Sequence, residues 1–459
     1  MSAAAPITSM YVHVPFCAHK CSYCAFYSEP SSGELINRYV RALIGELELI
    51  APDVRPATVF FGGGTPSLLN VRQWEQILGA MQRLGLLGAS EWTVECNPAT
   101  VSLDKARLLR AWGVNRISMG VQSLEAALLE RLGRIHTPEM VFKSYDILRQ
   151  AGFDNVNLDL MFAIPGQSLR AWRDTLRETL AMGSEHLSSY EVIYEEDTVL
   201  YQQLQAGEFD QDDDLACAMY EELVEQTARA GFEQYEVANF ARRAGKPDAF
   251  KKNPQPESFE PASSGCGIEI LGGPWDGLHT EGPLSPSEGE REKPRQIKDV
   301  VHVRDSSIRP KCSMESAGTN QPAVPQYACR HNVNYWRGGS FYGAGPSATS
   351  YVRGLRTKNW ANTPLYCEQL ERGRRAVEST EELSPLRRAG ETAAFGLRMV
   401  AGWPFEEFRR VTGQDLRREW ATAMERLEHQ GWGVLMPDHF KLTRLGLRFA
   451  DAAAQEFLR

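Results

Sequence analysis

The stretch Tyr11–Tyr27, Y-V-H-V-P-F-C-A-H-K-C-S-Y-C-A-F-Y, carries three cysteines in the spacing C-x3-C-x2-C: Cys17, Cys21 and Cys24. No fourth cysteine lies nearby. A fully ligated iron–sulfur cubane takes four thiolates, so three leave one iron with an open coordination position. The alternative is a zinc knuckle, in which His13 or His19 is the fourth ligand of a tetrahedral site. The cysteines alone therefore predict a metal site and leave both metals open.

Composition narrows the class of protein. The 459 residues suffice for two or three domains, and 50 Lys+Arg against 59 Asp+Glu give a net charge of -9. That charge argues against a nucleic-acid partner, because phosphate binding relies on clustered basic residues. We find neither an apolar run of membrane-spanning length nor the features of a signal peptide. The nine cysteines do not form a disulfide framework, so we expect a cytoplasmic protein without a transmembrane segment.

Short apolar runs alternate with amphipathic helical stretches, such as 34–50, from residue 10 to about 240. Repeated strand–helix units predict a parallel sheet covered by helices. We therefore expect an α/β fold, a partial (β/α)6 barrel that is open on one side. Its strands are expected at Tyr11–Pro15, Ala57–Phe61, Trp92–Glu95, Arg116–Met119, Val156–Phe162 and Leu187–Ile193.

Chemically unusual segments follow nearly every expected strand. They are the cysteine loop, G-G-G-T-P-S, E-C-N-P, G-V-Q-S and D-L-M-F-A-I-P-G. In α/β barrels the loops at the carboxyl ends of the strands build the active site. We therefore expect these five segments to form one site.

Domain boundaries follow from changes in composition. We expect a tail at 1–8, the barrel at 9–246, an insertion at 247–326, a segment that completes the core at 327–375, and a C-terminal domain at 376–459. The insertion holds 11 of the 25 prolines and shows little periodicity, which predicts disorder. The C-terminal domain has a helix–hairpin–helix pattern typical of a winged helix. Its mixed charges favour a packing role over DNA binding.

Several polar residues in these segments suit a nucleotide-like ligand. The glycine run allows close approach of the backbone, and Glu95 can accept hydrogen bonds from a ribose diol. Gln122 and Asp159 can face the same pocket, and the planar guanidinium of Arg134 can neutralise a carboxylate. Each residue alone is better explained by a structural role, and the set together favours a binding site.

The cysteine loop resembles that of the radical S-adenosylmethionine (SAM) superfamily, where the amino and carboxylate groups of SAM occupy the open iron. Y-V-H-V-P-F-C, F-G-G-G-T-P-S, E-C-N-P, R-I-S-M-G-V-Q-S, L-G-R-I-H and Y-E-V-A-N-F-A are similar, in order, to the oxygen-independent coproporphyrinogen oxidase group. The resemblance implies that Cys17, Cys21 and Cys24 hold a [4Fe-4S] cluster. It implies that SAM is surrounded by Tyr11, Tyr23, Gly63, Gly64, Thr65, Glu95, Gln122, Arg134 and Asp159.

Two features favour the heme chaperone branch of that group, the HemW type, over the true coproporphyrinogen dehydrogenases. Phe26 stands where the dehydrogenases have a further cysteine, and only sixteen residues precede Cys17. The motif H-N-x-x-Y-W of the branch is present, which implies heme contacts for His331, Asn332, Tyr335 and Trp336.

The expected function is therefore delivery of heme to acceptor proteins, with respiratory-chain proteins as candidates and a homodimer left open. Radical SAM decarboxylation of porphyrinogen propionates to vinyl groups is the alternative. The chain departs from its relatives in one respect, because about 80 residues separate Y-E-V-A-N-F-A from the R-H-N segment.

Overall fold

A computed structural model describes residues 5–30, 32–243 and 324–458. The expected insertion at 247–326 falls almost wholly outside the described residues, so its predicted character remains a prediction. In the described ranges, no helix is both long and apolar enough to cross a membrane.

A nine-stranded sheet forms the centre of the described structure, in the order β11-β1-β4-β5-β6-β7-β8-β10-β9. Strands β11 through β8 in this order run parallel, and β10 (Asn239–Arg242) pairs antiparallel with both β8 and β9 (Phe232–Glu236). The parallel strands are β1 (Ile7–Val14), β4 (Val54–Gly63), β5 (Glu91–Cys96), β6 (Arg116–Gln122), β7 (Val156–Phe162), β8 (His186–Glu191) and β11 (Tyr342–Ala344).

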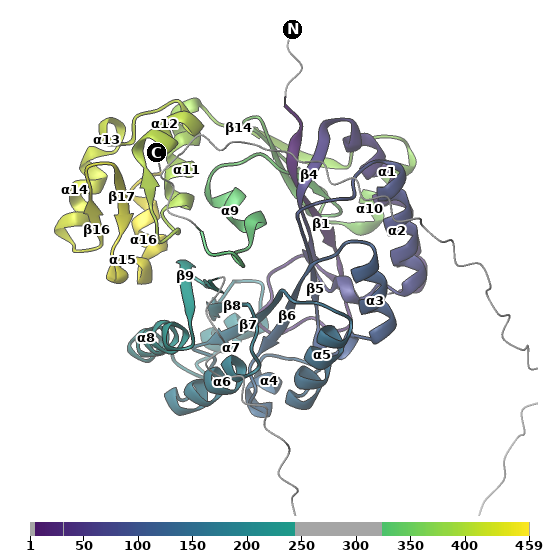
Figure 1. The fold of residues 1–459 in the computed structure, drawn as a ribbon, viewed down its shortest axis with the longest axis horizontal. Coiled ribbons are helices and arrows are strands. Elements are labelled where there is room, and N and C mark those ends of the chain that lie inside the picture. The colour runs from purple at the N-terminus through teal and green to yellow at the C-terminus, as the bar shows by residue number, and fades with distance from the viewer. Residues whose placement is uncertain (1–4, 31, 244–323, 459) are drawn as a thin grey trace, which may run out of the picture. The chain divides into compact units, whose positions relative to one another are not determined.

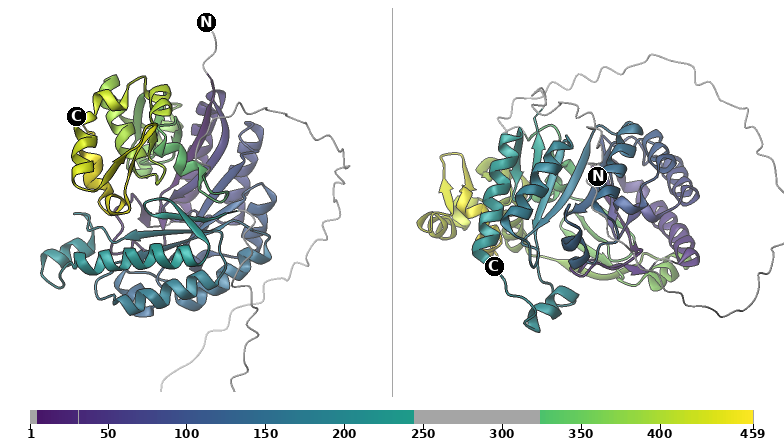
Figure 2. Two further views of the ribbon diagram at one scale, coloured as in Figure 1. Left: turned by 60° about the vertical axis from the view of Figure 1, so that its left-hand side comes forward. Right: turned by 90° about the horizontal axis from the view of Figure 1, so that it is seen from below.

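Helices cover the outer face of the curved sheet (Figures 1 and 2). Helices α4 (Ala126–Arg131) and α7 (Val199–Gln205) instead pack with Met161 and Ile164 in a separate cluster. The covering helices are α1 (Gly33–Ile50), α2 (Val71–Arg83), α3 (Leu103–Ala111), α5 (Pro138–Gln150), α6 (Leu169–Ala181) and α8 (Asp213–Arg229). The apolar stripes of these helices pack on alternate strand residues, as where Phe61 of β4 meets Trp74 of α2. The other alternate residues face the barrel interior, and many of them are polar.

The expected partial barrel is confirmed. Strands β4, β5 and β6 are longer than predicted at one or both ends, and β7 has the predicted bounds. Strands β1 and β8 start earlier than predicted and end one and two residues earlier, respectively. Two parts of the sheet were not expected. Strand β11 comes from the segment after the insertion and has only three residues, too few to show a period of two. The antiparallel pair β9–β10 closes the other end of the sheet.

The C-terminal elements form their own hydrophobic core. The expected helix–hairpin–helix is present as α14 (Ala421–His429), β16 (Gly433–Leu435), β17 (His439–Leu442), α15 (Arg444–Arg448) and α16 (Ala450–Gln455). Strand β15 (Trp403–Pro404) joins the hairpin, and α11 (Pro385–Gly396), α12 (Phe405–Thr412) and α13 (Leu416–Glu419) pack around it.

Shorter elements complete the core. A small sheet of β12 (Thr349–Val352), β13 (Leu355–Asn359) and β14 (Val377–Glu382) follows β11, and α10 (Thr363–Glu371) packs on α1. Strands β2 (Phe16–Cys17) and β3 (Glu29–Pro30) bracket the cysteine loop. Helix α9 (Arg330–Trp336) lies between the barrel strands and the C-terminal helices (Figure 1).

Glu46 joins these elements to the barrel. Its buried carboxylate accepts hydrogen bonds from Gly345 N (2.7 Å), Asn359 Nδ2 (2.7 Å) and Tyr366 Oη (2.6 Å), and burial raises its pKa. We expect Glu46→Ala to lower the free energy of unfolding by about 3 kcal/mol, because three buried donors lose their acceptor. Urea unfolding measures this, with the exposed Glu48→Ala on the same helix as the control. If Glu46→Ala lowers the free energy of unfolding no more than Glu48→Ala does, Glu46 does not join these elements to the barrel.

Candidate functional site

A cavity of about 500 Å³ opens at the carboxyl ends of the parallel strands. Its walls combine the cysteine loop with residues of β7 and with the ends of β4, β5, β6 and β8 and the segments that follow those four strands. Eleven of the predicted site residues line it: Cys17, Cys21, Tyr23, Cys24, Gly63, Gly64, Thr65, Glu95, Gln122, Arg134 and Asp159. Tyr11 and the four residues predicted to contact heme are not among the residues that line this cavity.

Backbone hydrogen bonds hold the cysteine loop on the barrel. Ser22 N donates to Leu132 O (3.0 Å), and Ser22 O accepts from Leu200 N (2.9 Å). Within the loop, Cys24 N donates to Cys21 O (3.2 Å). The loop is thus bound to helices α4 and α7, and its three thiols face a common cavity.

The glycine run packs directly against the cysteine loop. Gly64 N donates to Val14 O (2.8 Å) and Thr65 N to Phe16 O (2.7 Å). Gly63 has φ +101°, and a Cβ there would lie 2.4 Å from the ring of His13. Only glycine fits this position, because a side chain would meet both strain and a buried ring.

The His13 ring packs against Gly63 of the glycine run. Its Nε2–H donates to Tyr27 O (2.9 Å), so Nδ1 is the acceptor for the Tyr11 hydroxyl (3.0 Å). Burial lowers the pKa of His13, which keeps the ring neutral. Both ring nitrogens are therefore engaged, and the zinc-knuckle alternative loses one of its two candidate histidines. Tyr11 does not line the cavity, and its hydroxyl helps to hold the His13 ring in place beside the glycine run.

Two carboxyl groups lie inside the cavity. Glu95 Oε2 accepts from Gly63 N (3.2 Å), and Asp159 accepts from Ser118 Oγ (2.9 Å) and Asn157 Nδ2 (2.7 Å). Burial, together with the neighbouring Asp159, raises the pKa of Glu95 to about 8. Burial also raises the pKa of Asp159. These groups suit hydrogen-bond donors of a ligand, such as hydroxyl or ammonium groups.

The raised pKa of Glu95 makes stability depend on pH. From its ordinary value of 4.5 up to about 8, folded Glu95 keeps a proton that the unfolded chain has lost, so rising pH destabilises the protein in that window. We expect Glu95→Gln to gain about 2 kcal/mol over wild type between pH 5 and 9, less than the full shift would give because Glu95 is partly exposed. Urea unfolding across this range measures the difference. If the free energy of unfolding changes with pH in the same way in wild type and in Glu95→Gln, the raised pKa of Glu95 does not affect stability.

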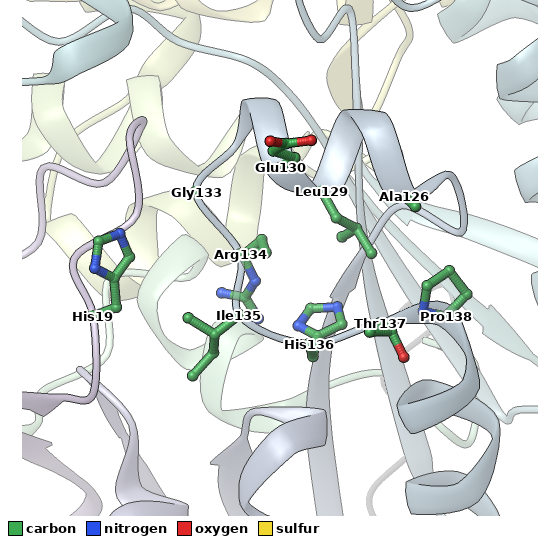
Figure 3. Close-up of a pocket in the computed structure, with 10 residues that line it drawn as sticks. All are labelled: His19, Ala126, Leu129, Glu130, Gly133, Arg134, Ile135, His136, Thr137 and Pro138. Carbon is green, nitrogen blue, oxygen red and sulfur yellow. The ribbon is translucent and has the colours of Figure 1, made fainter. Parts of the chain in front are cut away.

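Arg134 connects the cysteine loop to the strand ends. Its guanidinium contacts Cys21 Sγ (3.5 Å) and donates to Gly120 O (2.7 Å), while Nε is buried with no acceptor among the described residues. Arg134 also lines a second, shallower cavity of about 390 Å³ beside the loop 133–138 (Figure 3). His19 lies across from it in that view and is exposed.

The residues predicted to contact heme lie on α9. His331 is 1% exposed, and its Nε2 bonds the Tyr335 hydroxyl (2.7 Å). Its Nδ1 lies 3.1 Å from Ser9 Oγ and 3.0 Å from Thr58 Oγ1. Burial lowers the pKa of His331 to about 3, so the ring is neutral. The motif thus packs against the barrel interior, with both nitrogens of its histidine engaged.

The remainder of the motif faces the C-terminal domain. Trp336 packs on Phe395 of α11, and the guanidinium of Arg398 lies 5.3 Å from the Trp336 ring. Asn332 is half-buried on the same helix. The motif residues therefore connect the barrel to the C-terminal helices.

Some cavity residues were not predicted. Ser118, Tyr190, Glu191, Ile193 and Glu195 also line the cavity. The segment 190–195 lies at the end of β8, where position alone would have indicated it. This segment contains no glycine or proline, the residue types that indicated several of the other strand ends.

The donor set fits the group implied by the cysteine loop. The three thiols share one loop and one cavity, and a buried guanidinium nitrogen lacks an acceptor beside them. No three His, Cys, Asp or Glu side chains in the described ranges are arranged to hold a single metal ion. Thiolates of a cubane bind separate irons, so a cluster suits this spacing better than one zinc ion does.

Known proteins match the chain along most of its length. Residues 11–179 match the radical SAM superfamily, and residues 383–449 match the HemN C-terminal domain. The heme chaperone HemW of Bacillus subtilis is 28% identical over 429 residues, or 92% of each chain. HemW of Escherichia coli is 27% identical over 465 residues, covering 99% of this chain and 98% of the relative.

Two further matches are less complete or more distant. The mitochondrial radical S-adenosyl methionine domain-containing protein 1 of Danio rerio is 36% identical over 239 residues, 51% of this chain and 54% of the relative. The solved structure of coproporphyrinogen III oxidase (HemN) from E. coli, a radical SAM enzyme, has a TM-score of 0.70 at 17% identity, covering 99% of this chain and 90% of that one. At that identity the likeness shows a shared fold.

Residues 11–179, which carry the cysteine loop and most of the parallel sheet, thus form a domain that matches the radical SAM superfamily. The last part of the chain matches the HemN C-terminal domain, and the chain as a whole resembles the heme chaperones called HemW.

Proposed function

We propose that this protein is a heme chaperone that holds a [4Fe-4S] cluster and SAM and passes heme to acceptor proteins. The main support is that eleven predicted site residues line one cavity. The chain also matches the HemW relatives of B. subtilis and E. coli over nine-tenths of its length or more. Heme-accepting proteins, with respiratory-chain proteins as candidates, are the proposed partners, and a homodimer is the proposed assembly. The described cysteines are free, which suits the proposed cytoplasmic location.

The cavity residues have distinct proposed roles. Cys17, Cys21 and Cys24 bind the cluster, and SAM at the open iron supplies radical chemistry when the cluster is reduced. The glycine run brings backbone close to the ligand, while Glu95 and Asp159 accept its hydrogen bonds. Arg134 stabilises the charge on Cys21, which it contacts.

His331 is the proposed iron ligand of heme, together with Asn332, Tyr335 and Trp336 around the porphyrin. Because both its nitrogens are engaged, iron binding requires the His331 ring to give up its hydrogen bonds to Ser9, Thr58 and the Tyr335 hydroxyl. We expect His331→Ala to weaken heme binding at least about tenfold and to change the Soret band, as loss of an axial ligand does. The exposed His429→Ala on α14 is the control. Heme spectra and affinity equal to wild type would remove His331 as the ligand.

The enzyme alternative has one supporting observation, since the full set of predicted SAM residues other than Tyr11 lines the cavity. The exposed Phe26, at the position where dehydrogenases have a cysteine, argues against it. Reconstituted protein incubated with coproporphyrinogen III, SAM and reductant distinguishes the two functions. Formation of vinyl products at the expense of propionates would overturn the chaperone proposal.

A further inference from the structure

Large apolar side chains gather at the opening of the cluster cavity. Phe26 is 70% exposed and Ile193 63%, and Ile135 and Tyr190 are 47% and 43% exposed. All four line the same cavity, although they come from three separate segments of the chain. We call these four residues the apolar rim. Exposed apolar side chains gathered around one opening mark a binding surface rather than chance exposure.

The size of the cavity limits what the rim can hold. A volume of about 500 Å³ is that of a site for one small ligand, and the polar residues of the interior suit SAM. A second and larger ligand has to lie over the opening rather than inside it. The four side chains around the opening can pack against one face of a flat apolar ligand.

Charge around the opening is uneven. Exposed Lys20 and His19 lie on the cysteine loop and line the cavity. Glu191, the last residue of β8, and Glu195, in the segment after it, line the cavity too. In Figure 3, which draws the shallower cavity, His19 and Ile135 belong to separate loops. A ligand with anionic groups along one edge would therefore place that edge at the cysteine loop.

We propose that heme docks over the cavity, with its porphyrin face on the apolar rim and its propionates towards Lys20. This rests on the proposed function, since it names where a heme chaperone meets its cargo while α9 remains packed in the barrel. The contact is with the macrocycle and the propionates, not with the iron. It therefore differs from a site at His331.

Hemin and iron-free protoporphyrin IX, titrated into the full chain, test the proposal. We expect both to bind wild type. Phe26→Ser combined with Ile193→Ser should weaken protoporphyrin IX binding at least about tenfold, because apolar contact area supplies the affinity, while hemin keeps the proposed ligand site at His331. The control combines Leu355→Ser with Leu435→Ser, two similarly apolar, exposed residues on β13 and β16. Ile193→Ser alone, expected to weaken binding less, replaces the double variant if the latter does not fold.

Lys20→Glu is expected to weaken binding severalfold, with the exposed Lys358→Glu as its control.

The outcomes separate this proposal from the function on which it rests. If wild type binds neither porphyrin, the heme chaperone function itself fails. If wild type binds hemin, but protoporphyrin IX does not bind or the rim variants bind it as tightly as their control does, the rim proposal is overturned and the chaperone function stands. Loss of protoporphyrin IX binding in the rim variants, with the control unchanged, supports the rim proposal.

Discussion

Cys21→Ser, purified without oxygen and supplied with iron and sulfide, is expected to retain at most about a tenth of the wild-type cluster. A serine hydroxyl stays protonated where a thiol ionises, so the substitution removes one of three ligands and leaves its iron unprotected. Cys21 is also the thiol that Arg134 contacts, at 3.5 Å, so its loss leaves a buried guanidinium without that partner. Iron and acid-labile sulfide per chain, with the visible spectrum, measure the effect.

Cys217→Ser on α8 is the matched control, because this half-buried cysteine lies outside the cavity and is expected to leave the cluster intact. SAM affinity should fall together with the cluster in Cys21→Ser, because the open iron is its proposed anchor. Full iron and sulfide in Cys21→Ser would exclude the thiol as a ligand. Zinc without iron or sulfide in the wild-type protein would replace the cluster with the zinc alternative.

The barrel and its cavity followed from local sequence because each strand carries its own pattern. Alternating burial along β4, for example, places Phe61 in the core and leaves glycine at the strand end. The parallel arrangement then brings all the strand ends to one edge, so Gly63 meets Glu95, 32 positions away, and Cys21 meets Arg134, 113 positions away. Polar residues at five strand ends could therefore be assigned to one site before any distance was known.

The surroundings of His331 could not be predicted in this way. Its partners Ser9 and Thr58 are 322 and 273 positions away, and neither marks itself by residue type. A histidine beside aromatic residues has the same local pattern whether it faces a porphyrin or a barrel interior. The apolar rim was missed for a similar reason, because Ile193 and Phe26 look like core residues until their exposure is known.

Gly63→Ala is expected to disrupt SAM binding more than any other single-methyl change in the cavity. The added Cβ would lie 2.4 Å from the His13 ring, at φ +101°, where an alanine is already strained. Since His13 is held by Tyr11 and by Tyr27 O, the ring has no free direction in which to move. The glycine run must shift instead, and with it the backbone N–H of Gly63 that meets Glu95. We expect SAM affinity to fall at least about tenfold, since displaced backbone loses several ligand contacts.

Gly113→Ala separates backbone strain from the clash. Gly113 has φ +102°, almost the same as Gly63, but nothing lies within 4 Å of a Cβ built there. Its substitution is expected to cost about 1 kcal/mol of stability and to leave SAM affinity unchanged, because only strain is added. Isothermal titration with SAM and thermal unfolding of both variants measure the two effects. Equal behaviour of the variants would mean that strain alone acts at Gly63, whereas loss of SAM binding in Gly63→Ala only would place the ligand against the glycine run, above the ring of His13.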